Sequence, residues 1–156
     1  MNFDNQLHKN DLEKIRALLS GTGVFTPIEI DIAIELAEDR LSGKDTSYQF
    51  IFARDNEMLL AYTCFGEIPL TNKRYDLYWI AVDKTNQNNG IGRQILDKTE
   101  GEIKALGGEI VYIETSGSFE YLNTQNFYLK QGYKLVTTLA DFYTDNNDKL
   151  IYEKRL

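Results

Sequence analysis

Apolar positions in the N-terminal part of the chain recur at helical spacing. Residues 11–20 place four aliphatic side chains on one face: Leu12, Ile15, Leu18 and Leu19. A second helix is predicted to run to about Leu41. Its start is marked by Thr26 and Glu29, which can form a capping box, and by Pro27 at the first helical position. Its apolar residues form one broad apolar face, made of Ile28, Ile30, Ile32, Ile34, Leu36 and Leu41.

From Ser47 onward the period of the apolar pattern becomes two, which is typical of strands. The pattern predicts a hairpin whose strands are residues 48–54 and 58–66, joined by a turn. A loop with one proline follows at residues 68–73. Residues 76–82 are apolar on both faces after Asp76, which predicts a strand in the centre of the sheet.

The second half of the chain alternates between helical and strand patterns. A helix is predicted at residues 91–106, a buried strand at 109–115, a short helix at 121–130 and a terminal hairpin at 133–156 with its turn at 145–148. The strand–helix–strand unit at 76–115 predicts a right-handed crossover with parallel strands. The expected fold class is mixed α/β (α+β), with a mostly antiparallel sheet, one parallel strand pair and flanking helices.

Length and composition further narrow the classes of protein to which the chain can belong. The 156 residues predict a single domain, 1–156, since a second core needs about another 100 residues. No run of about 18 apolar residues is present, and the N-terminus lacks the basic start and apolar stretch of a secretory signal. The net charge of −7 makes nucleic acid an unfavourable partner.

Cysteine and histidine are scarce. Cys64 is the only cysteine, so no internal disulfide can form, and a reducing, cytoplasmic location is expected. A buried, inert thiol is the expected state of Cys64. Because Cys64 and His8 are the only soft ligands, no metal is expected.

The segment between the central strand and the next helix carries the most informative chemistry. A polar stretch at residues 83–89 follows the buried strand, and the helix then begins at Gly90 and Gly92. The first N–H groups of a helix have no partner within it and lie at the positive end of its dipole, so this turn can bind an anion. The glycines allow a phosphate to approach closely, and Arg93 can add positive charge.

The glycine pair is also compatible with a purely structural role, in which the two glycines only shape a strand-to-helix turn. Two kinds of nucleotide site are disfavoured by the spacing. A Walker-type loop is excluded, because no Gly-Lys-Ser/Thr follows, and the Gly-x-Gly-x-x-Gly spacing of dinucleotide folds is missing.

Two motifs together resemble the GNAT superfamily of N-acetyltransferases. The stretch Gln87-Asn88-Asn89-Gly90-Ile91-Gly92 matches the Gln/Arg-x-x-Gly-x-Gly/Ala signature. The stretch Asn126-Phe127-Tyr128-Leu129-Lys130-Gln131-Gly132-Tyr133 is similar to the Phe-Tyr-x-x-x-Gly-Phe/Tyr motif. Trp79-Ile80-Ala81-Val82-Asp83 resembles the strand before the signature, and the order of elements agrees over almost the whole chain. The sequence departs from the family at Asn126, where alanine is common.

The resemblance implies acetyl-CoA as a cosubstrate, bound between the two parallel central strands. It implies that the loop holds the pyrophosphate, that strand backbone pairs with the pantetheine arm, and that an N–H near Val82 polarises the thioester carbonyl. Asn123 matches a position that often contacts the cofactor. The implied cofactor-binding residues are Ile80, Ala81, Val82, Gln87, Asn88, Asn89, Gly90, Ile91, Gly92, Arg93 and Asn123.

The resemblance also implies direct transfer of the acetyl group to an amine. Tyr128 is the candidate general acid for the leaving thiolate, and its alternative role is packing in the core. A base must take the amine proton, because a lysine-like ammonium has a pKa near 10.4. The candidate bases are Glu114, Glu67 and Asp76. Glu114 ranks first, because partial desolvation on a buried strand is expected to raise its pKa.

The predicted function is acetyl transfer from acetyl-CoA to a primary amine on a small molecule, a peptide N-terminus or a lysine. The main alternative is a non-catalytic module that binds acyl-CoA to sense or regulate, and a nucleotide-binding domain is the third. The acidic residues of the second helix either form a solvent face or attract a cationic amine. Tyr75, Tyr78 and Trp79 either line the acceptor cleft or pack the sheet. A homodimer through the C-terminal hairpin or another sheet edge fits the pattern.

Overall fold

The computed structural model describes all 156 residues and resolves two compact units. The first unit is Met1–Gly66 with Tyr78–Glu102, and the second is Glu67–Leu77 with Ile103–Leu156. In chain order, the elements are β1 (Asn2–Asp4), α1 (Asp11–Thr22), α2 (Pro27–Ser42), β2 (Gln49–Asp55), β3 (Met58–Glu67), β4 (Arg74–Val82), the 3₁₀ turn η1 (Lys84–Asn86), α3 (Ile91–Ala105), β5 (Ile110–Ser116), the 3₁₀ turn η2 (Phe119–Tyr121), α4 (Leu122–Lys130), β6 (Lys134–Thr144) and β7 (Asn147–Arg155).

The mixed α/β fold expected from the sequence is confirmed. The strands form one sheet in the order β1-β2-β3-β4-β5-β7-β6. The β4 and β5 strands are parallel and pair Arg74–Asp76 with Ile110–Tyr112. The ladders of β1 with β2, β2 with β3, β5 with β7 and β6 with β7 are antiparallel. None of the helices is long and apolar enough to cross a membrane.

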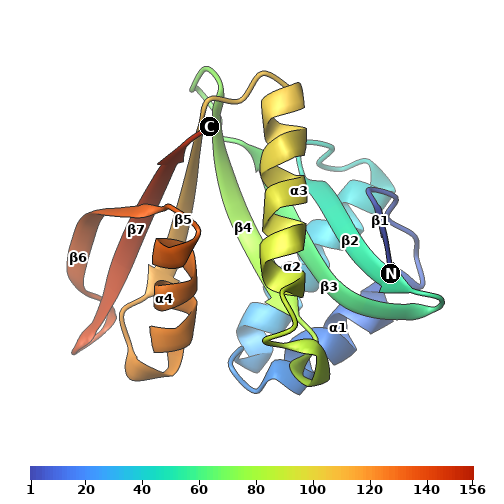
Figure 1. The fold of residues 1–156 in the computed structure, drawn as a ribbon, viewed down its shortest axis with the longest axis horizontal. Helices are drawn as coiled ribbons and strands as arrows, with labels where there is room; N and C mark the ends of the chain where they lie inside the picture. The colour runs from blue at the N-terminus through green and yellow to red at the C-terminus, as the bar shows by residue number, and fades with distance from the viewer. The chain divides into compact units, whose positions relative to one another are not determined.

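In the first unit, helices cover both faces of the strands (Figure 1). Helices α1 and α2 pack on Phe52 of β2 and on Tyr62 and Cys64 of β3. The neighbouring residue Thr63 points to the opposite face, because successive strand residues alternate. There its hydroxyl oxygen lies 2.7 Å from that of Thr99 of α3, in a buried hydrogen bond. Cys64 is fully buried, as expected, and burial raises the pKa of its thiol.

Helix α2 begins as predicted but buries only half of its apolar residues. The Thr26 side chain accepts a hydrogen bond from the Glu29 amide, and the Glu29 carboxylate accepts one from the Thr26 amide at 2.7 Å. The buried residues are Ile30, Ala33, Ile34 and Ala37. Ile28 and Ile32 are 73% and 45% exposed, so the broad apolar face of this helix is only partly buried. A helix packed on one side buries a single stripe, and the second isoleucine row lies outside it.

Strand β1 is an element that the sequence pattern did not predict. It pairs with Phe52–Arg54 of β2, and the Arg54 guanidinium donates to Asp4 at 2.9 Å and to Asp11 at 2.7 Å. Asp11 is buried, and although desolvation opposes it, the hydrogen bonds from Arg54 and the His8 amide hold its pKa below the usual value. The strand depends on a partner far along the chain, so its own three residues carry little signal.

In the second unit, α4 packs on one face of β5 and β7. The Tyr128 ring of α4 lies 5.8 Å from the ring of Tyr152 on β7 and 5.9 Å from that of Tyr133. Strand β6 forms the outer edge of the sheet order beyond β7, and all of its residues are exposed. The terminal hairpin is confirmed, with a tighter turn than predicted, since β6 ends at Thr144 and β7 begins at Asn147.

Candidate functional site

The loop predicted to hold phosphate lies in the first unit, between β4 and α3. Its own hydrogen bonds brace it: the Asp83 carboxylate accepts from the Thr85 amide at 3.1 Å and from the Asn86 side chain at 2.9 Å. The Gln87 side-chain amide donates to the Val82 carbonyl at 3.2 Å. Hydrogen bonds from Thr85 and Asn86 also hold the pKa of Asp83 below its usual value. The loop is therefore shaped by internal contacts.

The amides at the start of α3 suit an anion. Gln94 donates its N–H to the Gly90 carbonyl at 3.1 Å, so the N–H groups of Ile91, Gly92 and Arg93 precede the helical ladder. Gly90 has a φ of +78°, and a Cβ there would meet only the Gln94 side chain, at 3.8 Å. Residues 87–90 are exposed. This arrangement fits a phosphate at the positive end of a helix of 15 residues.

Two side chains of the signature are less available for anion binding than the sequence suggests. The Arg93 guanidinium lies 3.7 Å from the Asp97 carboxylate one turn further on, and its side chain is 72% exposed. The Gln87 side chain turns back to Val82. In this conformation the backbone amides are therefore the groups best placed to bind an anion.

The end of β4 carries the segment expected to pair with pantetheine. Ala81 is buried, and Ile80 and Val82 are half-buried. Trp79 packs edge-on against Phe25 with ring centroids 5.4 Å apart, so this candidate cleft residue belongs to the core of the first unit. Tyr78 packs edge-on against Tyr48 at 5.6 Å and is 37% exposed.

Asp76, Glu114 and Lys149 form an ionisable cluster in the second unit. Asp76 of β4 pairs with Tyr112 of β5, and Glu114 follows two residues later, so both carboxyl groups lie on the same sheet face. Lys149 of β7 binds the Glu114 carboxylate at 2.5 Å. Burial raises the pKa of Asp76 to about 6, the charge of Glu114 adds to the rise and that of Lys149 opposes it.

The desolvated carboxyl group is therefore that of Asp76. The Glu114 side chain, which ranked first from the sequence, is 50% exposed and ion-paired, so it is less desolvated than that of Asp76. Asp76 lies on β4 and pairs with Tyr112 of β5, and its side chain is only partly exposed. The third candidate, Glu67, is exposed and accepts the Lys73 amide at 2.9 Å, which closes the loop between β3 and β4.

Tyr128 lies on α4 and is 4% exposed. Its ring is surrounded by Phe127, Tyr133 and Tyr152, and burial raises the pKa of its hydroxyl above the usual value. The hydroxyl therefore keeps its proton at neutral pH. Asn123 is exposed in the first turn of the same helix.

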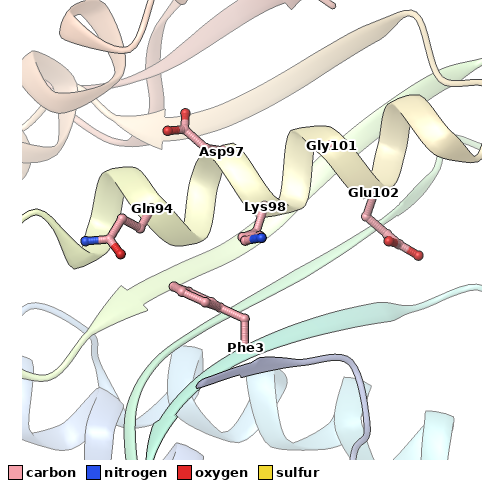
Figure 2. A pocket seen from close by; sticks show the side chains of 6 residues that line it. All are labelled: Phe3, Gln94, Asp97, Lys98, Gly101 and Glu102. Carbon is pink, nitrogen blue, oxygen red and sulfur yellow. The ribbon is translucent and has the colours of Figure 1, made fainter. Parts of the chain in front are cut away.

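A depression beside α3 lies further along this helix from the Gly90 turn, and it includes the side chains of Gln94 and Asp97. Figure 2 shows the Phe3 side chain facing this helix. The depression is lined by Phe3, Gln94, Asp97, Lys98, Gly101 and Glu102. The Lys98 ammonium lies 5.8 Å from the centre of the Phe3 ring. None of the candidate site residues lines this depression.

Sequence reasoning missed Lys149 and Phe142. The Lys149 side chain is only 15% exposed, and its ammonium lies 4.3 Å from the centre of the Phe142 ring. Alternation along residues 147–155 could have placed Lys149 and Ile151 on one face. The register of β7 against β5, which brings Lys149 to Glu114, has no local signal.

Comparisons with known proteins agree with this geometry. A family model described as an acetyltransferase (GNAT) domain matches residues 46–135. A crystal structure from Desulfovibrio desulfuricans, described as a GNAT-family acetyltransferase, is 36% identical, with a TM-score of 0.94 over 99% of this chain and 98% of the other. A search of curated protein sequences found no match to the chain.

Two more distant structures share the fold. The ribosomal-protein-S18-alanine N-acetyltransferase from Escherichia coli is 17% identical, with a TM-score of 0.77 over 99% of this chain and 92% of the other. An aminoglycoside 6'-N-acetyltransferase complexed with coenzyme A is 18% identical, with a TM-score of 0.76 over 99% and 97%. On the family model and the 36% identical structure, the chain belongs to the GNAT family of acetyltransferases.

Proposed function

We propose that this acetyltransferase moves the acetyl group of acetyl-CoA directly to a primary amine. The observation that carries the proposal is the open, left-handed turn at Gly90, which presents the first amides of α3. The family model and the related structure with bound coenzyme A support acetyl-CoA as the cosubstrate. Acetyl-CoA supplies the activated acetyl thioester.

Backbone groups do most of the cofactor binding in this proposal. The amides of Ile91, Gly92 and Arg93 bind the pyrophosphate, and the backbone of Ile80 to Val82 offers hydrogen bonds to the pantetheine arm. Asn123 adds an exposed polar contact from α4. An N–H group near Val82 polarises the thioester carbonyl.

Asp76 attracts the acceptor ammonium and accepts its proton, directly or through a water molecule. Its pKa rises from 3.8 to about 6, which reduces the difference between its pKa and that of an ammonium group by about two units. This lowers the free energy needed to transfer the proton to Asp76 by about 3 kcal/mol. The amine nitrogen then bonds to the acetyl carbon while the C–S bond breaks. The leaving thiolate receives the proton of Tyr128, the nitrogen loses its second proton to water, and the tyrosinate takes a proton back from water.

A panel of primary amines incubated with acetyl-CoA tests this function, with release of free thiol as the readout. We expect saturable release that depends on the amine. A non-catalytic acyl-CoA-binding module would bind the cofactor and release no thiol with any amine. If ATP displaced coenzyme A in a thermal-shift assay, the nucleotide-binding alternative would be favoured instead.

Substitution of Gly90 by valine is expected to raise the Kd for acetyl-CoA about tenfold, since the side chain would stand where the phosphate approaches. Gly23→Val is the matched control, because Gly23 also has a positive φ, of +71°, and lies in open space at the end of α1. Both variants carry similar backbone strain. Calorimetry on both separates binding from folding, and an equal change in the two Kd values contradicts the assigned phosphate site.

A homodimer through the outer edge of β6 is part of the proposal. Eleven exposed residues at the end of the sheet order leave a long unpaired edge, which favours pairing with a second copy. Light scattering after gel filtration should give twice the mass of the chain. Val136→Lys, which places a charge at a residue that is 49% exposed on this strand, should give a single chain. A wild-type mass of one chain contradicts the dimer.

A cytoplasmic location completes the proposal. Cys64 is a free, buried thiol, and its burial keeps it in the neutral form. No internal disulfide of this chain therefore depends on an oxidising compartment. Fluorescence from a fusion of the chain in intact cells would show the compartment directly.

A further inference from the structure

The sheet of the second unit has one face that carries none of the helices of that unit. Helix α4 packs on the face of Tyr152, which pairs with Ile113 on one side and Leu135 on the other. The opposite face carries Glu114, Ile151 and Thr137 in one cross-strand row. The next row on that face is Ser116, Lys149 and Leu139. Asp76 lies at the inner end of the same face, beside Tyr112.

We call this face, which carries no helix of the second unit, the open face. One of its carboxyl groups has no ionic partner. Lys149 is held by Glu114, so the two charges offset each other. Asp76 forms no ion pair, although both groups influence its titration. The carboxylate of Asp76 can therefore attract and neutralise a single ammonium group. A second positive charge nearby would be repelled by the ammonium of Lys149.

The surroundings of these charges are partly apolar. Leu139 and Phe142 are 41% and 52% exposed, and Ile151 is half-buried between Glu114 and Thr137. Lys149 itself shows what the face accommodates: a primary ammonium on an aliphatic stem, held between the carboxylate of Glu114 and the ring of Phe142, 4.3 Å away.

We infer that the acceptor is a primary amine with a single positive charge and an apolar or aromatic body, and that Lys149 selects against acceptors with two or more charges. The ammonium binds at Asp76, and the body lies on Ile151, Leu139 and Phe142. This inference rests on the proposed function and names the substrate class of the same site. This specificity distinguishes the enzyme from an acetyltransferase whose acceptor site binds several ammonium groups.

Three amines test the inference on the wild-type protein: 2-phenylethylamine, ethanolamine and putrescine. We expect kcat/KM for 2-phenylethylamine to exceed that for each of the other two by about tenfold or more, from the apolar area buried and the single charge. An equal or higher value for putrescine or ethanolamine overturns the inference. If acetyl-CoA binds and none of the three amines is acetylated, the inference fails while the cofactor site stands. If acetyl-CoA does not bind, the proposed function itself fails.

Lys149→Met tests whether the charge of Lys149 selects against acceptors with two or more positive charges. Release of the Glu114 carboxylate should raise the ratio of kcat/KM for putrescine to that for 2-phenylethylamine by about tenfold. The ratio cancels any change in the titration of Asp76, which affects both amines. Lys130→Met, at an exposed lysine near the end of α4, should leave the ratio unchanged. An unchanged ratio in the Lys149 variant overturns the selecting role.

Leu139→Ser and Leu135→Ser form a matched pair for the apolar contact. Both leucines lie on β6 and are 41% and 48% exposed, but Leu139 pairs with Lys149 on the open face and Leu135 pairs with Tyr152 on the α4 face. Only Leu139→Ser should lower kcat/KM for 2-phenylethylamine, by about fivefold, and it should leave the value for ethanolamine unchanged. Equal effects of the two substitutions overturn the placement of the acceptor body. Melting curves of both variants check that each remains folded.

Discussion

Substitution of Tyr128 by phenylalanine is expected to lower kcat about 100-fold while the Kd for acetyl-CoA stays unchanged, because the phenol is needed only when the thiolate leaves. The tyrosine is 4% exposed, and burial raises the pKa of its hydroxyl, so the proton is in place at neutral pH. Thiol release at saturating amine gives kcat, and calorimetry gives the Kd.

Tyr152→Phe is the matched control for this substitution. Tyr152 is 2% exposed, and its ring lies 5.8 Å from that of Tyr128, so its variant loses a hydroxyl from the same packed cluster. Its kcat should stay within a factor of about two of the wild type. If both variants lose activity equally, the effect comes from packing, and Tyr128 is not the proton donor.

The second large effect is expected at Asp76. Asp76→Asn should lower kcat/KM about 100-fold at pH 7, because the amide cannot accept the proton of the amine. In the wild type, only the carboxylate form is active as a base. Its activity should therefore rise with pH through about 6, where burial and the charge of Glu114 place the pKa. The variant should lack this inflection in a profile of kcat/KM between about pH 5 and pH 8.

Loss of folding cannot explain the expected loss of activity at Asp76. The folded-state pKa lies above the unfolded value, so the carboxyl group binds its proton more tightly in the folded protein. Its contribution to the free energy of unfolding is present below the unfolded pKa and is lost as pH rises to about 6. The asparagine variant carries no such charge and should melt at pH 7 no lower than the wild type.

Parallel variants distinguish the three candidate carboxyl groups. Glu114→Gln removes the partner of Lys149, and Glu67→Gln removes the acceptor of the Lys73 amide, but neither should abolish the inflection near pH 6. Glu109→Gln, at an exposed carboxylate paired with Lys73 and Arg74, is the neutral control. If the inflection follows Glu114 instead, Asp76 is not the base.

Features with local causes were predictable from the sequence. The capping box of α2 depends on residues three positions apart, so its start was correct. The phosphate loop follows from a strand that ends in a polar stretch and a helix that begins after Gly90. The structure agrees on where this helix starts, since α3 begins at Ile91. The parallel pairing of β4 with β5 followed from the helix that connects them.

Features that depend on distant partners were not predictable in the same way. Helix α2 carries two rows of isoleucines, and only packing on the sheet decides that Ile30 and Ile34 are buried while Ile28 is 73% exposed. Strand β1 pairs with Phe52–Arg54 of β2, about 50 residues further along the chain, and Arg54 binds Asp4 there. The pairing of Lys149 with Glu114 depends on the register of β7.

The family resemblance, the order of the helices and strands from α1 to β7, and the loop whose amides suit a phosphate could all be read from the amino-acid sequence. These depend on backbone geometry and on residues close together in the chain. The folded structure was needed to show which carboxyl group is desolvated and which cation opposes the rise of its pKa. Desolvation and ion pairing depend on the strands that surround a side chain, and for this reason we propose Asp76, and not the first-ranked Glu114, as the base.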